Sequence, residues 1–496
     1  MTQISIFDYP IDEWTVKQFS ANGFCCDKAR IALEEKFIKL TSVTDEYNRQ
    51  SVSFQLSKKD SVHRWLKYKE GFSADLVMKL LKEMGIKEGD TVLDPFMGSG
   101  TTSLVCKFNN INSIGFDILP MTKISIKAKD AIMDYDIEEL NRMYDAFVNS
   151  STPKNYKGKF NYISITDSAF PDETEKDVVY YTEWINKSDY SKISKNLFVL
   201  CIINSLESIS YTRKDGQYLA WDSRSRKIIE ANKARAARGA KPIDRLNKGD
   251  IPTFHTALEY ELQNVITDIK SLQNEGDIGN GKIHYEEGSS LLNLPKLDSQ
   301  IIEGVVTSPP YCNRYDYTRT YALEMNYLGL SSAEITKLRQ SLVSCTVENK
   351  SKIDFLKEYY ASIGKAEDYN RILNIYRSID ALNETREALQ IRQDNGEINN
   401  KGVLRMVDGY FTDLTFIYAE IYRLLKDGGS IAVVNDNVRY AGEVIPVDFI
   451  SSEIAEKIGF KVKKIYTLKQ KKGNSSQQMA KYGRVALRKS ITIWQK

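Results

Sequence analysis

The segment TVLDPFMGSGTTSLVCKFNNINSIGFD, residues 91–117, contains two short apolar runs separated by a glycine-rich turn and a helical pattern. TVLDPF predicts a strand, TTSLVCKF predicts the helix after the turn, and SIGFD predicts a second strand that ends in an acid. A strand, a glycine turn, a helix and a second strand are typical of the start of a doubly wound sheet. We therefore expect an α/β fold with a mainly parallel sheet.

The turn of this segment is a candidate ligand-binding loop. Glycines allow positive φ and let the backbone approach a ligand closely. Asp94 ends the first predicted strand and Asp117 ends the second, where an acid can bind ribose hydroxyls. The spacing GSGTT matches neither GxGxxG nor GxxxxGK[ST], so a pyrophosphate cradle or a P-loop fits poorly. The alternative is that both acids are helix N-caps. Upstream, Lys69–Ser73 could lie against the same pocket.

Further apolar runs along the chain predict the remaining strands. Between the second strand and the next clear one lies an insertion that is much longer than an ordinary connection. ISITDSAF, around Asp167, competes with KIHYEEG for the third strand, and we prefer the latter because it is close to the run that follows it. The predicted strands are KIHYEEG at 282–288, IIEGVV at 301–306, SIAVVND at 430–436, GFKVKKIYTL at 459–468 and SITIWQK at 490–496.

Composition indicates an ordinary globular chain of 496 residues, with 42% hydrophobic and 27% charged residues. The net charge is only +3, so any affinity for a polyanion must come from a local patch. Residues 211–248 are such a patch, with eleven Lys or Arg against four Asp or Glu, and with Tyr211, Tyr218 and Trp221 among them. The alternative for this stretch is a solvated loop and helix.

Cysteine and histidine are sparse and scattered, which argues against a disulfide framework and against a metal site. The six cysteines include adjacent Cys25 and Cys26 but no CxxC pair, and there are three histidines. MTQISIFDYPIDEW at the N-terminus lacks a signal-peptide core, and the apolar run at 197–206 is too short to span a bilayer. We expect no metal, no membrane association and a cytoplasmic location.

The stretch VVTSPPYCNRY, residues 305–315, ends a predicted strand with two prolines, which donate no backbone hydrogen bonds. Together with the glycine turn it carries a resemblance. YKEGFS (68–73), DPFMGSGTT (94–102), GFD (115–117), EEGSS (286–290) and TSPPY (307–311) resemble successive motifs of the S-adenosylmethionine-dependent DNA methyltransferases that modify exocyclic amino groups, as in restriction–modification systems.

The resemblance implies a Rossmann-like methyltransferase sheet with two large, mainly helical insertions. The N-terminal extension would comprise 1–60. The catalytic domain, which binds S-adenosylmethionine, would be formed by 61–124, 281–330 and 405–496. Residues 125–280 would be an insertion that recognises the DNA target, and 331–404 a helical insertion. Either insertion could read the DNA, and we prefer the first because of its basic stretch.

For the cofactor, the resemblance implies that the glycine loop lies under the methionine moiety, that Asp117 holds the ribose and that Glu287 lies near the adenine. Phe72 and Ser73 would contact the amino-acid end of S-adenosylmethionine. The implied cofactor-binding residues are Phe72, Ser73, Asp94, Pro95, Phe96, Gly98, Ser99, Gly100, Thr101, Asp117 and Glu287.

For catalysis, the resemblance implies that the Ser308 hydroxyl and the Pro309 carbonyl accept hydrogen bonds from the target amine. Pro310 would stiffen the loop, and Tyr311 would pack on a base flipped out of duplex DNA. Cytosine-C5 enzymes use a Pro-Cys pair, but Tyr311 separates Cys312 from the prolines, so we interpret this thiol as an ordinary small side chain. For DNA contacts we select Arg213, Arg224, Arg226, Lys227 and Arg314.

The initial serine of TSPPY favours cytosine N4 as the methylated atom, because adenine-N6 enzymes usually begin this motif with Asp or Asn. Adenine N6 is the alternative. Many relatives with TSPPY carry it before the glycine motif, whereas here the glycine motif comes first. Other readings are an RNA amino-methyltransferase, a DNA-binding subunit without catalysis, and a nucleotide-dependent oxidoreductase. A cognate restriction endonuclease is a further expected partner.

Overall fold

The computed structural model describes residues 14–44, 46–47, 52–53, 60–69, 71–215, 219–243, 246–468, 480–485 and 487–496. Of the residues considered in the sequence, Glu70, Tyr218, Asp244 and Arg245 lie outside these ranges, as do residues 1–13 of the N-terminal stretch.

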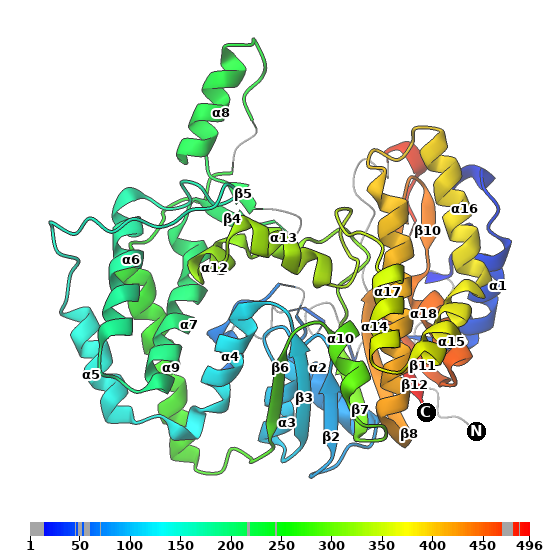
Figure 1. Ribbon diagram of the computed structural model, residues 1–496, viewed down its shortest axis with the longest axis horizontal. Helices are drawn as coiled ribbons and strands as arrows, with labels where there is room; N and C mark the ends of the chain where they lie inside the picture. Colours follow the sequence, from blue (N-terminus) through cyan, green and yellow to red (C-terminus); the bar gives the residue numbers. More distant parts are fainter. Residues whose placement is uncertain are drawn as a thin grey trace.

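An eight-stranded sheet crosses the molecule in the order β1–β11–β12–β8–β7–β2–β3–β6 (Figure 1). The central strands β8, β7, β2, β3 and β6 are parallel, and β12 is antiparallel to both of its neighbours. The predicted doubly wound, Rossmann-like α/β sheet is therefore confirmed. Its strands are β1 (Thr41–Thr44), β2 (Thr91–Asp94), β3 (Asn112–Asp117), β6 (Ile283–Glu287), β7 (Ile302–Thr307), β8 (Leu425–Asp436), β11 (Lys461–Leu468) and β12 (Lys489–Gln495).

The order of the strands brings distant parts of the chain together. β2 lies between β3 and β7, with Leu93 paired to both Ile114 and Val305. Because parallel strands end at the same edge of a sheet, the glycine turn after β2 and the proline turn after β7 are neighbours. β6 pairs with β3, so KIHYEEG is the strand beside SIGFD, as predicted, and residues 163–170 form no strand.

Many of the helices form two groups, one beside β6 and one beside β8 (Figure 1). On the β6 side are the helices of the first insertion: α5 (Ile137–Val148), α6 (Asp172–Lys187), α7 (Lys192–Ile209), α8 (Arg226–Ala236) and α9 (Phe254–Glu275). The β8 side holds α1 (Lys28–Phe37), α14 (Ile353–Ser362), α15 (Ala366–Arg377), α16 (Asp380–Asp394), α17 (Gly402–Leu424) and α18 (Val447–Ile458).

The remaining elements cover the sheet or connect the two groups. The helices are α2 (Ala74–Glu83), α3 (Thr101–Phe108), α4 (Pro120–Asp130), α10 (Ser290–Asn293), α11 (Tyr317–Thr320), α12 (Ala322–Tyr327) and α13 (Ser332–Ser341). Two small antiparallel pairs are β4 (Thr212–Lys214) with β5 (Leu219–Trp221), and β9 (Val438–Tyr440) with β10 (Glu443–Ile445). Among the described residues, no helix is long and apolar enough to cross a membrane.

The N-terminal part of the described chain is tied to the far edge of the sheet. β1 pairs in parallel with β11. Behind it, the fully buried guanidinium of Arg488 contacts two carboxylates, Glu34 at 2.5 Å and Asp448 at 3.0 Å. Arg30, also fully buried, lies 3.1 Å from Glu443. Two of these pairs, Arg488 with Glu34 and Arg30 with Glu443, join residues more than 400 positions apart. The network therefore ties the N-terminal part of the described chain to its C-terminal part.

Replacing Arg488 with methionine should destabilise the fold strongly, because Glu34 and Asp448 would lose their buried counter-charge. We expect the free energy of unfolding to fall by about 3–5 kcal/mol, as is typical when one partner of a buried pair is removed. Urea denaturation followed by circular dichroism measures the change. Lys36→Met is the control, since its pair with Glu456 is exposed and should contribute at most about 1 kcal/mol. Equal effects of the two changes would contradict the role of the network.

Candidate active site

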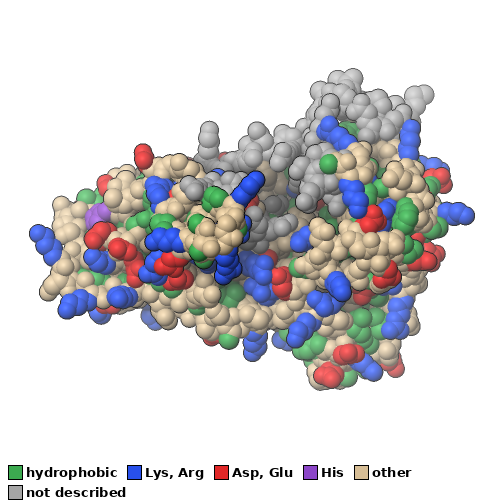
Figure 2. Space-filling view, turned by 90° about the horizontal axis from the view of Figure 1, so that it is seen from above, with side chains coloured by type: hydrophobic (Ala, Val, Ile, Leu, Met, Phe, Trp, Pro, Cys, Tyr) green, Lys and Arg blue, Asp and Glu red, His purple; other side chains and the backbone are tan. Residues whose placement is uncertain are grey.

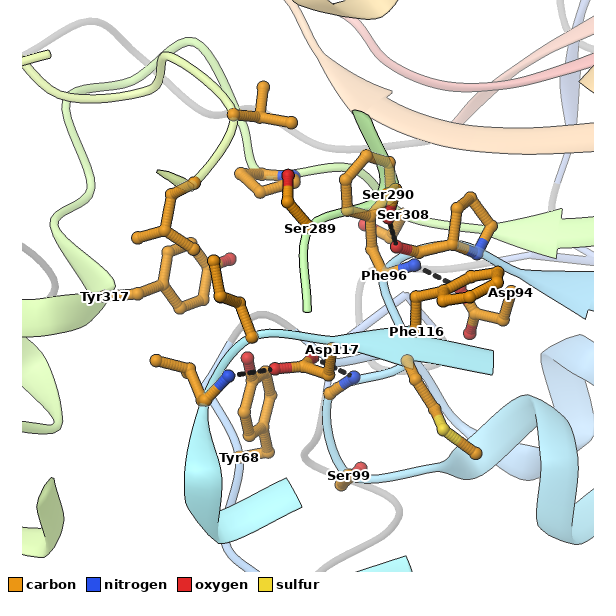
Figure 3. Close-up of a pocket in the computed structure, with 18 of the residues that line it drawn as sticks. Tyr68, Asp94, Phe96, Ser99, Phe116, Asp117, Ser289, Ser290, Ser308 and Tyr317 are labelled. Atoms are coloured by element: carbon orange, nitrogen blue, oxygen red, sulfur yellow. Dashed lines mark hydrogen bonds between the residues drawn. The ribbon is translucent and has the colours of Figure 1, made fainter. Parts of the chain in front are cut away.

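A cavity of about 760 Å³, open to solvent, lies at the carboxyl ends of β2, β3, β6 and β7. Figure 3 shows Ser99 and Asp117 on one side of the cavity and Ser308 and Tyr317 on others. The glycine turn and the proline turn thus face one shared space, although they are far apart in the sequence.

The glycine turn has a left-handed backbone that only glycine adopts easily. Gly98 has φ +53° and Gly100 has φ +81°. A Cβ on Gly98 would lie 2.9 Å from Cε1 of Tyr68, and one on Gly100 would lie 2.0 Å from Cδ1 of Ile126. Behind the turn, the buried ammonium of Lys129 donates a hydrogen bond of 2.8 Å to the Ser99 carbonyl. The turn is therefore held close to its neighbours, with its backbone toward the cavity.

Both strand-end acids brace this turn. Asp117 accepts hydrogen bonds from the backbone N–H of Gly98 at 2.7 Å and of Leu119 at 2.8 Å (Figure 3). Asp94 accepts one from the backbone of Phe96 at 3.1 Å and one from the Thr307 hydroxyl at 2.8 Å. Burial raises the pKa of each carboxyl to about 6. Neither acid is a helix N-cap, because Gly100 precedes α3 and Leu119 precedes α4.

The bond between Asp94 and Thr307 ties the glycine segment directly to the proline turn. The turn continues after Thr307, and two of its residues, Ser308 and Pro310, line the cavity. The Ser308 hydroxyl donates to the Tyr311 hydroxyl at 3.1 Å, and Tyr311 is only 2% exposed. Nζ of Lys489 lies 4.8 Å from the centroid of the Tyr311 ring. The hydrogen bond to the buried Tyr311 hydroxyl thus orients the Ser308 hydroxyl.

Comparison with known proteins shows the family to which this chain belongs. A family model described as DNA methylase matches residues 53–127. The Type II methyltransferase M.BsoBI of Geobacillus stearothermophilus is 53% identical over 486 residues, which cover 98% of this chain and 95% of that protein. The chain belongs to the Type II DNA methyltransferases. M.AvaI of Nostoc sp. is 37% identical over 94% of this chain and 92% of its own length.

A more remote Type II methyltransferase, M.MjaII of Methanocaldococcus jannaschii, is 34% identical over 135 residues, or 27% of this chain. The methyl donor of this methyltransferase family is S-adenosylmethionine, and its members act in restriction and modification. The predicted family, DNA methylation and cofactor are confirmed.

Most of the residues selected from the sequence of this methyltransferase lie on the cavity wall. Those that line it are Phe72, Asp94, Pro95, Phe96, Gly98, Ser99, Thr101, Asp117, Ser308 and Pro310. Gly100, Pro309 and Tyr311 lie in the same two turns but do not line the cavity. Ser73 is fully buried, and its hydroxyl caps α2. Glu287 ends β6, where its half-exposed carboxylate pairs with Lys123 at 2.8 Å.

Several cavity residues were not selected from the sequence. Tyr68 and Tyr317 line the methyltransferase cavity and stack on each other with centroids 6.3 Å apart. Tyr68 begins the YKEGFS motif, so its position could have indicated a role. Ser341–Val343 line the cavity from the second insertion, where no sequence pattern points to them. The others are Gly71, Met97, Phe116, Ile118, Leu119 and Gly288–Ser290.

The thiol next to the proline turn is unsuited to nucleophilic chemistry. Cys312 is fully buried, and burial raises its pKa, which disfavours the reactive thiolate. All six cysteines are free thiols. Among the described residues, no three His, Cys, Asp or Glu side chains gather where a metal ion could bind.

The basic residues selected for DNA contacts lie in different surroundings. Arg213 is exposed on β4. Arg224 is bound by Asp222 at 2.8 Å, and Arg226 lies 3.3 Å from Asp167. The half-buried Lys227 donates to the carbonyls of residues 164 and 165. Arg314 has φ +68° just after the proline turn, and its buried Nε has no hydrogen-bond partner among the described residues.

Proposed function

We propose that this methyltransferase transfers a methyl group from S-adenosylmethionine to the exocyclic N4 amine of a cytosine flipped out of duplex DNA. The observation that carries the proposal is the shared cavity, which Gly98 and Asp117 line together with Ser308 and Pro310. A sulfonium methyl held at the glycine turn and an amine held at the proline turn would meet in this space.

The residues present suit this cofactor. The carboxylate of Asp117 ends β3 and would accept hydrogen bonds from the ribose hydroxyls. Phe72, Phe96 and Phe116 supply apolar wall for the remainder of the molecule. The glycine turn lies on the cavity wall at Gly98 and Ser99, where the methionine moiety would contact it. When bound, S-adenosylmethionine supplies an electrophilic methyl group on a positively charged sulfur.

The proline turn would orient the amine. The Ser308 hydroxyl gives its hydrogen to Tyr311, which leaves oxygen lone pairs free to accept from an amine in the cavity. The Pro309 carbonyl would accept the second amine hydrogen, and Pro310 restricts the turn. Catalysis would then arise from orientation and charge complementarity, without a covalent intermediate.

The target base lies inside a duplex stack and has to leave it to reach this cavity. Stacking of that base on Tyr311 remains part of the proposal, although the ring is buried and faced by Lys489. The ring could receive a base only after a local displacement. We therefore assign Tyr311 a further role, in which its hydroxyl holds Ser308 in the orientation that accepts the amine.

Around this centre we propose that 61–124, 281–330 and 405–496 form the catalytic part and that 125–280 recognises duplex DNA. A cytoplasmic location and a cognate restriction endonuclease complete the proposal. Cytosine is favoured over adenine because the motif begins with Ser308 and not with Asp or Asn, and adenine N6 is the alternative.

Cofactor binding should depend on pH through Asp117. Burial raises its pKa to about 6, and ribose hydroxyls would donate to the carboxylate form. Affinity should therefore be full above pH 6 and fall as the pH decreases, with Kd rising by up to about tenfold per pH unit. Calorimetric titration between pH 5 and 7.5 measures this. Asp117→Asn should bind more weakly and without this dependence. If that variant keeps the dependence, another group is responsible.

The proposed reaction is tested by incubating a plasmid with the protein and tritiated S-adenosylmethionine, followed by nucleoside mass spectrometry. We expect N4-methylcytosine in duplex DNA and no transfer to tRNA. N6-methyladenine would establish the alternative base. Absence of transfer to any duplex, with S-adenosylmethionine bound, would refute the enzyme activity.

A further inference from the structure

A helical arm stands out from the first insertion. It comprises residues 222–243 and 246–249 of the described chain, with α8 as its rising part and 237–243 as its returning part. Figure 1 shows α8 projecting from the body above β4 and β5. Figure 2 looks down on the arm and shows Lys and Arg side chains around it. The backbone N–H of Ile243 donates to the Asn232 side chain at 2.8 Å, so the returning part is fastened to the helix.

The base of the arm is rigidly fixed. The Asp222 carboxylate, only 1% exposed, accepts from Nε of Arg224 at 2.8 Å and from the backbone N–H of Lys248 at 2.8 Å. Nζ of Lys248 donates to three carbonyls at the end of α7 and in β4, those of Glu207, Ser210 and Thr212. Both ends of the arm are therefore fastened at one point, and the direction of the arm is set by this contact.

The cations at the base serve this anchoring. Arg224 is neutralised by Asp222, Arg226 lies beside Asp167, and Lys227 donates to backbone carbonyls while its ammonium sits 4.5 Å from the Trp221 ring centroid. These acids offset part of the positive charge that a phosphate would meet. The base residues selected from the sequence are therefore poor candidates for DNA contact.

The cations at the tip have different surroundings. Lys233, Arg235, Arg238 and Lys241 are all exposed. In the part of the chain that the structure describes, none of the four forms an ion pair with an acid; Arg235 donates to the Lys241 carbonyl. Two exposed apolar side chains, Ile229 and Ile243, lie on the same arm. Four positive charges on a narrow projection match a polyanion.

We infer that the tip of the arm docks on duplex DNA at the major groove, with Lys233, Arg238 and Lys241 against phosphates. This rests on the proposed function. An α-helix with its side chains is about 10–12 Å wide, which fits the major groove of about 12 Å. The contacts at Asp222 fasten the base of the arm to the body of the protein. We infer that the arm thereby sets the position of the duplex from which the base is extruded.

The test compares two charge-matched triple variants. The tip variant is Lys233→Gln, Arg238→Gln, Lys241→Gln. The control variant, Lys17→Gln, Lys28→Gln, Lys39→Gln, removes three exposed charges from the N-terminal part of the chain, outside the insertion proposed to recognise DNA. Kd is measured from 50 to 300 mM salt on a duplex that the wild type methylates, and Kd for S-adenosylmethionine is measured in parallel.

We expect the tip variant to bind the duplex about 10–100-fold more weakly at 100 mM salt and to lower the slope of log K against log salt by about 2–3, since each phosphate contact contributes about 0.9. S-adenosylmethionine affinity should stay at the wild-type value, and the control variant should keep the wild-type slope. If log K falls with log salt at the same slope for the tip variant and for the wild type, the inference is overturned. The same holds if the tip variant changes only self-association or binding of the endonuclease. If the wild type neither binds nor methylates a duplex, the proposed function fails instead.

Discussion

Replacing Ser308 with alanine should lower kcat for methyl transfer by about 10²–10³-fold while Kd for S-adenosylmethionine changes by less than about twofold. The hydroxyl is placed to accept the target amine, and its loss leaves the glycine turn and Asp117 untouched. Single-turnover transfer from tritiated S-adenosylmethionine measures the chemical step, and calorimetry measures cofactor binding. Cys312→Ala is the control, because this buried thiol has no chemical role in the proposal and its removal should leave kcat within about threefold of the wild type.

Tyr311 variants separate the two roles assigned to that residue. Tyr311→Phe keeps the ring and removes the hydroxyl that holds Ser308, so we expect kcat to fall about tenfold, as for loss of one hydrogen bond of about 1–1.5 kcal/mol. Tyr311→Ala removes both and should reduce transfer further, with cofactor affinity retained. Wild-type turnover in Tyr311→Phe would show that the hydroxyl is dispensable, and wild-type turnover in both variants would exclude Tyr311 from the site.

Replacing Asp117 with alanine should raise Kd for S-adenosylmethionine about 100-fold. Two interactions are lost together: the carboxylate that would bind the ribose, and the acceptor for the Gly98 N–H that shapes the glycine turn. Hydrogen bonds to a charged group contribute about 1.5–3 kcal/mol, which corresponds to this order of effect. Calorimetry without DNA gives the value. The control is Asp134→Ala, which removes an exposed acid that does not line the cavity and should leave Kd for S-adenosylmethionine unchanged. Unchanged cofactor affinity in Asp117→Ala would remove this residue from the cofactor site.

The sheet and much of the cavity could be predicted from sequence because their signals are local. Apolar runs such as TVLDPF and SIAVVND end at turns, and the strand ends of a parallel sheet converge, which brings the glycine and proline turns together. The third strand was the harder choice. KIHYEEG and ISITDSAF both have strand-like patterns, and only the pairing of β6 with β3 separates them.

The remaining features depend on contacts between residues far apart in the chain. The weak pattern before residue 60 gave no indication of β1, which joins the sheet by pairing with β11 near the other end of the chain. In the same way, Arg224 and Arg226 count as free charges in a sequence, and only the folded chain places Asp222 and Asp167 beside them. The burial of Tyr311 and the arrival of Ser341–Val343 at the cavity have no local signature either.

The most direct measurement is a crystal structure of the protein with a non-transferable analogue of S-adenosylmethionine. The account predicts that the analogue lies in the cavity between the two turns, with its ribose at Asp117 and the atom that replaces the methyl group turned toward Ser308 and Pro309. An analogue bound outside this cavity, or one whose reactive end faces away from the proline turn, would contradict the claim that donor and amine meet there.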